Sequence, residues 1–77
     1  MQVKEHDFVV LTADLPEQRL QAGDVGTVVH VYAGRAAVEV EFVSLDGETV
    51  ALATLPASGV RAANMGEIMH ARSMAST

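Results

Sequence analysis

The segment that most constrains the fold covers residues 36–43, where apolar and acidic side chains alternate from Val38 to Phe42. The apolar positions are Val38, Val40 and Phe42, and the acidic positions are Glu39 and Glu41. A period of two residues is typical of a β-strand that packs one face on a core and turns the other to water. Asp46-Gly47 follows, and glycine tolerates the positive φ of a tight hairpin turn. The sequence therefore predicts an antiparallel hairpin whose second strand covers residues 48–54.

The second strand of this hairpin also alternates in side-chain size. Val50 and Leu52 are predicted to face the core, because they are the larger aliphatic residues. Thr49, Ala51 and Ala53 are then predicted to face outward. Such a small outer face suits the close approach of a neighbouring chain.

Three further strands are expected. Residues 7–12 contain the apolar run Phe8–Leu11, which predicts a buried strand, and Phe8 and Phe42 are both expected inside. After a loop over residues 13–22, a strand is predicted at 25–32, where Gly26 indicates a bend or a close backbone approach. Residues 55–59 predict one turn of 3₁₀ helix, followed by a very short strand at 60–62.

The end of the chain carries a helical pattern. Asn64 can cap a helix, and Glu67 three residues later can return the bond, as in a capping box. Met65, Ile68 and Met69 would then share one face. The sequence predicts a short C-terminal helix of about ten residues, which is marginal alone and must dock on something.

Together these elements predict an all-β fold: a small five-stranded SH3-like barrel over residues 1–63 and a C-terminal helical tail over 64–77. The segment Gly23–Val29 resembles the Gly-Asp-x-Gly-x-Val signature of KOW-type barrels, and similar strings occur in the barrel of the nitrile hydratase β-subunit. With Val9–Pro16, Val40–Phe42 and Leu55-Pro56, the chain most closely resembles an uncharacterised family of short bacterial proteins. That family has no assigned activity, so the resemblance implies no functional residue.

Composition excludes several classes of function. The chain has 77 residues, no cysteine and a formal net charge of −5. Without cysteine it has neither disulfides nor thiolate metal sites, which fits a reducing, cytoplasmic location. The acidic charge repels phosphate backbones and anionic lipid heads. The five basic residues are scattered, no apolar run is long enough to span a membrane, and residues 1–6 do not resemble a signal peptide.

No catalytic or cofactor-binding pattern is present. His6, His30 and His70 have no metal-ligand spacing, so no metal and no cofactor are expected. Glu39 and Glu41 share a strand face without the apolar surroundings that raise a carboxyl pKa. No serine lies in a nucleophile elbow. We therefore expect no enzyme activity and no catalytic residues.

The remaining expectation is contact with protein. Only two Phe and one Tyr are available to build a core, so a partner chain is expected to complete it. The sequence predicts a non-enzymatic interaction or scaffolding module that self-associates as a homo-oligomer or binds another protein. The predicted interface consists of Val29, Val31, Tyr32, Met65, Ile68 and Met69. Two alternatives stay open: a KOW-like nucleic-acid-binding domain, and an accessory domain of an enzyme.

Overall fold

The computed structural model describes residues 3–74, and it contains one antiparallel sheet of five strands. The strands are β1 (Phe8–Leu11), β2 (Val25–Val31), β3 (Ala37–Val43), β4 (Thr49–Pro56) and β5 (Val60–Ala62). Three single 3₁₀ turns join them: η1 (Pro16–Gln18), η2 (Ala33–Arg35) and η3 (Ala57–Gly59). The all-β fold is confirmed, and so are the 3₁₀ turn before the last strand and that strand's position.

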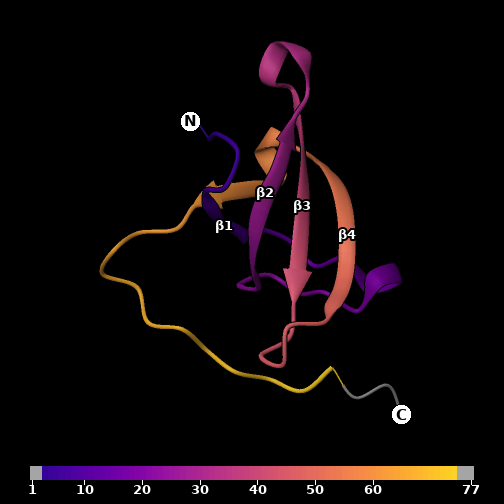
Figure 1. Cartoon of the computed structure of the whole chain (residues 1–77), viewed down its shortest axis with the longest axis vertical. Coiled ribbons are helices and arrows are strands. Elements are labelled where there is room, and N and C mark those ends of the chain that lie inside the picture. The colour runs from indigo at the N-terminus through magenta and orange to yellow at the C-terminus, as the bar shows by residue number, and fades with distance from the viewer. Residues whose placement is uncertain (1–2, 75–77) are drawn as a thin grey trace.

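The sheet is curved and open. Its strand order is β4-β3-β2-β1-β5, so β4 and β5 form the two edges and do not pair in the part of the chain that the structure describes. Figure 1 shows β2, β3 and β4 side by side, whereas β5 lies across their direction. A bulge between Val28 and His30 interrupts the β2–β3 ladder, and such bulges increase bend and twist. The fold is barrel-like, but the sheet is not closed.

The core lies on the concave face of the sheet and is aliphatic apart from one ring. Val9, Val28 and Val40 are fully buried, and Phe42 is 3% exposed. No buried polar or charged residue occurs among residues 3–74. The hydrophobic effect therefore holds this fold without a buried polar network.

Gly26 confirms the predicted close approach between strands. A Cβ atom at this position would lie 2.5 Å from Cγ1 of Val40 and 2.9 Å from Cε1 of Phe42. Both contacts are closer than carbon atoms tolerate, so only glycine fits here without a shift of its neighbours.

The predicted facing of β4 is wrong. Val50 and Leu52 are 37% and 53% exposed, whereas Ala53 is 3% exposed and Ala51 packs against the core. The pairing explains the inversion, because directly opposed residues in an antiparallel pair share a face. Ala51 lies opposite Phe42, and the register shifts beside that pair. Small residues therefore face the bulky ring.

The predicted C-terminal helix is also wrong. Residues 64–74 form no helix, and the predicted tail's residues 75–77 lie outside the described part. The capping turn itself does form, since the N–H of Asn64 donates to Oε1 of Glu67 at 2.7 Å and the N–H of Glu67 to the carbonyl of Asn64 at 3.0 Å. The helix does not continue because nucleation is costly, Gly66 in that turn disfavours helix, and no surface packs against the next turn.

The tail instead runs in extended form around the sheet. We call residues 63–74 the strap, and Figure 1 shows it leaving β5 on one side and returning beneath β3. Met74 at its end packs against the core. The segment therefore docks on its own chain. None of the described residues belongs to a helix long and apolar enough to cross a membrane.

Candidate functional site

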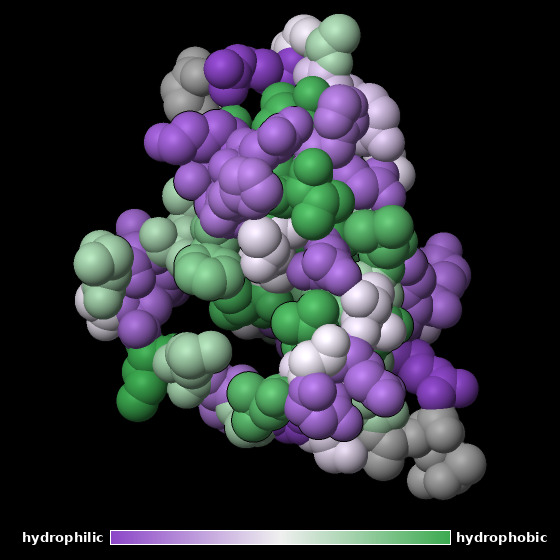
Figure 2. Space-filling model, in the orientation of Figure 1, coloured by the Kyte–Doolittle hydropathy of each residue, from purple (hydrophilic) through white to green (hydrophobic). Residues whose placement is uncertain are grey.

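An apolar cleft lies between the strap and the outer face of β1 and β2. Its volume is about 340 Å³. Figure 2 shows a gap between the strap and the rest of the molecule, bordered by hydrophobic side chains. The residues that line the cleft are Phe8, Val10, Gly23, Val25, Arg61, Ala63, Asn64, Glu67, Ile68, Met69 and His70.

Strand β1 supplies the floor of the cleft because it is apolar on both faces. Val9 and Leu11 belong to the core cluster, whereas Phe8 and Val10 face the other way. Val10 is 6% exposed although it lies outside that cluster, and Val25 is its cross-strand neighbour. Phe8 is 65% exposed, so its predicted burial is wrong. An exposed aromatic ring beside buried aliphatics marks a surface suited to protein contact.

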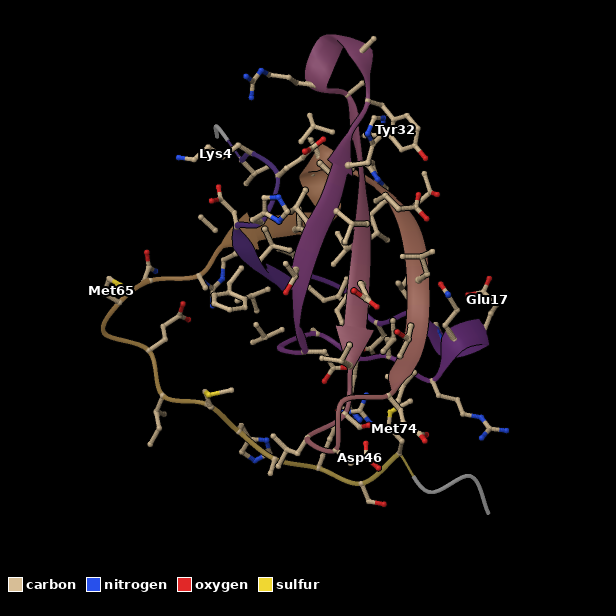
Figure 3. The ribbon with its side chains drawn as sticks, viewed as in Figure 1. Lys4, Glu17, Tyr32, Asp46, Met65 and Met74 are labelled. Carbon is tan, nitrogen blue, oxygen red and sulfur yellow. The ribbon has the colours of Figure 1, made fainter. Side chains whose placement is uncertain are left out.

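The strap supplies the opposite wall, and its apolar side chains are open to water. Met65 is fully exposed, Ile68 is 93% exposed and Met69 is 79% exposed. Figure 3 shows Met65 at the outer turn of the strap, away from the sheet. Three large apolar residues within five positions of the chain are therefore open to water, and two of them, Ile68 and Met69, line the same cleft as Phe8.

An ion pair fixes the strap where it leaves β5. Arg61 donates from Nη1 to Oε1 of Glu67 at 3.0 Å and from Nη2 to Oε2 at 2.5 Å. These bonds, together with the N–H of Asn64, lower the pKa of Glu67 to about 2. Both charges at this end of the cleft are therefore neutralised within the chain.

A second ion pair fixes the far end. Arg72 donates from Nε to Oδ1 of Asp24 at 2.9 Å and from Nη2 to Oδ2 at 2.5 Å. The same Nη2 donates to the carbonyl oxygen of Arg19 at 2.9 Å. Burial raises the pKa of Asp24, but hydrogen bonds from Arg72 and from the N–H of Gln21 outweigh this and hold the pKa below its ordinary value. Both side chains are largely shielded, with exposures of 23% and 18%.

The six predicted interface residues fall into two groups that the structure does not bring together. Ile68 and Met69 line the cleft, and Met65 adjoins it. Val29 lies at the bulge of β2, and Tyr32 follows the end of that strand. Figure 3 shows Tyr32 and Met65 on opposite sides of the molecule.

The β2 group is partly engaged within the chain. Val31 packs against the core and borders a separate, open depression of about 410 Å³ beside Lys4, Glu5 and Arg35. The Tyr32 hydroxyl donates to Glu39 at 3.0 Å. Its ring meets His30 edge-on, with centroids 4.6 Å apart. These contacts leave Val31 and Tyr32 less free for a partner than the strap residues, whereas Val29 is 39% exposed.

The two glutamates on β3, Glu39 and Glu41, both serve as hydrogen-bond acceptors. Hydrogen bonds from Thr54 and then Tyr32 lower the pKa of Glu39. A general acid needs the opposite shift. Glu41 accepts a hydrogen bond from the Thr49 hydroxyl at 2.5 Å. Among residues 3–74, no three His, Asp or Glu side chains lie close enough to hold a metal ion.

Sequence reasoning missed the sheet side of the cleft and both anchors of the strap. Phe8–Leu11 carries a usable signal, because a strand without polar alternation needs a cover on each face. Asp24 and Arg72 are 48 residues apart in the chain, so no local pattern connects them.

Comparison with known proteins gives one match. A family model described as "Domain of unknown function (DUF4926)" matches residues 5–62, which include all five strands. No curated protein and no solved structure matches the chain.

Proposed function

This chain belongs to the DUF4926 family, since the family model matches more than half of it, and we propose that it is a non-catalytic protein-interaction module that self-associates through the cleft. The single observation that carries the proposal is the cleft itself, with exposed Phe8 on the sheet and exposed Ile68 on the strap. The occupant is a second copy of the same chain.

Self-complementarity favours a second copy. The chain carries an apolar cleft and, at its strap wall, the exposed side chains of Ile68, which lines the cleft, and of Met65, which adjoins it. In a two-fold pairing, the same patch serves both subunits. Two straps packed side by side would place Met65 and Ile68 of each copy against Phe8 and Val25 of the other.

The charges around the cleft fit such a partner. Arg61 is paired with Glu67, and Arg72 with Asp24, so the cleft presents no unpaired charge from these four side chains. An uncharged apolar surface can therefore enter without leaving a buried ion unmatched. A strongly charged occupant would gain nothing from these groups.

The expected affinity is modest. Full burial of an aliphatic or methionine side chain contributes about 1.5–3 kcal/mol. Burying Met65 and Ile68 from both copies therefore contributes roughly 6–12 kcal/mol, while association costs about 4–15 kcal/mol. Partial burial of Phe8 and Met69 adds to the favourable side. At the favourable end of both ranges the net is about 8 kcal/mol, which corresponds to a dissociation constant of about 1 µM, so we expect weak association in the micromolar to millimolar range.

The same contacts weigh against the other classes of function. Arg61 and Arg72 are held by carboxylates, and Arg35 donates to the carbonyl of Val3, which leaves few cations for a nucleic-acid backbone. The lowered pKa of Glu39 argues against a role as general acid. No contact in the cleft specifically favours an accessory role beside an enzyme.

Sedimentation equilibrium of the full chain tests the proposal. Between about 1 µM and about 1 mM, the weight-average mass should rise toward twice that of one chain. Ile68→Asp should shift the dissociation constant upward by at least about tenfold, because a charge would enter an apolar contact. Leu45→Asp is the matched control, since Leu45 is 94% exposed but lies outside the cleft, in the turn between β3 and β4.

Two results would count against self-association through the cleft. The first is a wild-type chain that stays monomeric at millimolar concentration. The second is equal weakening by Ile68→Asp and Leu45→Asp, which would indicate a general effect of added charge.

A further inference from the structure

We infer that Arg72 is a positioning residue that latches the strap onto the turn before β2 and so forms the outer wall of the cleft. The importance of this wall for binding rests on the function proposed above. The latch itself rests on independent contacts, namely those of Arg72 with Asp24 and Arg19.

The strap needs such a latch because its middle part holds itself poorly. Residues Asn64–Ala71 are all exposed, and no regular secondary structure orders them. Arg61–Glu67 ties only the first turn, since these residues are six apart in the chain. Segments with few buried contacts open locally at low free-energy cost. Met74 packs against the core at the end of the strap, and Arg72 is the anchor closer in the chain to Ile68 and Met69, so we assign to it the placement of these two residues opposite Phe8.

Arg72 is suited to this task by its geometry. Its planar guanidinium donates to both carboxylate oxygens of Asp24, and such paired bonds fix orientation as well as distance. The third bond, to the carbonyl of Arg19, joins the strap to the end of η1. One side chain thereby ties the strap to two loops.

The receiving turn is itself rigid. Asp24 also accepts a hydrogen bond from the N–H of Gln21 at 2.9 Å, and its carbonyl accepts one from the N–H of Leu11 at 2.9 Å. Gly23 adopts φ of 96° to make this turn. The latch is therefore fastened to the sheet and not to a loose loop.

Backbone ¹⁵N relaxation of the full chain tests the latch directly. Arg72→Gln should lower the heteronuclear NOE of residues 68–73 to values typical of a mobile segment, while the NOE of the strands stays unchanged. Asp24→Asn keeps an oxygen that accepts from the N–H of Gln21 but removes the carboxylate charge. It should lower the heteronuclear NOE of residues 68–73 to the same extent. The double variant should be no worse than either single variant, because the two side chains act through each other.

Arg61→Gln is the matched control, because it removes an arginine–carboxylate pair at the near end of the strap. It should loosen residues 64–67 and leave residues 71–73 ordered. An unchanged NOE in Arg72→Gln, or equal loosening by Arg61→Gln at the far end, would overturn the latch.

The same samples separate this inference from the proposed function. If the latch forms the wall of the binding site, Arg72→Gln should weaken self-association about tenfold with little change in the melting temperature of the sheet. If the wild-type chain is monomeric and the strap becomes mobile in Arg72→Gln, self-association is refuted and the latch is supported. A dimer unaffected by Arg72→Gln would refute the wall's role in binding.

Discussion

Replacing Gly26 with alanine adds one methyl group at the most crowded point between β2 and β3. The new Cβ would lie 2.5 Å from Val40 Cγ1, 2.9 Å from Phe42 Cε1 and 3.0 Å from the carbonyl oxygen of Glu41. The valine methyl and the ring can turn only into a close-packed core. The carbonyl belongs to the backbone of β3 and cannot move alone.

The cost of this methyl group is that of overpacking a core, about 1–3 kcal/mol. In a domain of this size, each kcal/mol lowers the melting temperature by about 4–8 °C. We therefore expect Gly26→Ala to melt between about 4 and 24 °C below the wild type. A small domain has only a few kcal/mol of net stability, so the upper end of this range would leave much of the protein unfolded at 37 °C.

Thermal and urea unfolding followed by circular dichroism would measure this effect. Gly59→Ala is the matched control, because its Cβ would lie 3.6 Å from the Pro56 ring, an ordinary contact, and its φ is not positive. This control should be neutral or stabilise by up to about 1 kcal/mol. Equal melting temperatures for the two variants would refute the close approach of β2 and β3.

The remaining predictions concern the facing of β4 and the strap's response to acid. Ala53→Asp should destabilise the fold by several kcal/mol, because it buries a charge on the core face of β4. Leu52→Asp should cost less than about 1 kcal/mol, because Leu52 is on the exposed face. Equal unfolding midpoints of the two variants in urea would contradict the observed facing. The folded-state pKa values of Asp24 and Glu67 lie below their ordinary values of 3.8 and 4.5, so both anchors contribute fully above pH 4.5. Each anchor is lost as the pH falls through its lowered pKa, which is about 2 for Glu67. Amide hydrogen exchange of residues 64–73 should then accelerate, relative to the strands, only below about pH 4, and acceleration near pH 6 would contradict this.

Local patterns predicted the strands well because each strand carries its own signal. The alternation over residues 37–43 and the turn residues Asp46-Gly47 specify a hairpin without distant information. Gly26 likewise indicates a close approach of two strands, and the structure places Val40 and Phe42 there. The alternation and the turn depend on neighbours within a few residues, which is why the sequence contains them, whereas at Gly26 the glycine itself is the local signal of a distant contact.

The facing of β4 could not be obtained in this way. Alternation gives two possible faces, and side-chain size favoured Val50 and Leu52 as the core residues. The pairing of Ala51 with Phe42 decides the face, and that pairing depends on the register shift near the turn. Register is a property of two strands together.

The cleft could not be predicted from the sequence for a related reason. The helical spacing of Met65, Ile68 and Met69 is present, but spacing alone does not offset the cost of nucleating a short helix with Gly66 in its first turn. The strap's course depends on Arg72 meeting Asp24 across the fold. The sequence shows that Met65, Ile68 and Met69 are large and apolar, but it does not show their conformation or the residues of β1 and β2 that line the cleft with them.

Association through the cleft can be followed residue by residue in a concentration series of ¹H–¹⁵N spectra of the full chain. From about 1 mM down to about 20 µM, the amide shifts of Phe8, Val25, Ile68 and Met69 should move together along one binding curve, while Leu45 stays fixed. Spectra that do not change with dilution, or changes confined to Val29 and Tyr32, would contradict a contact at this cleft.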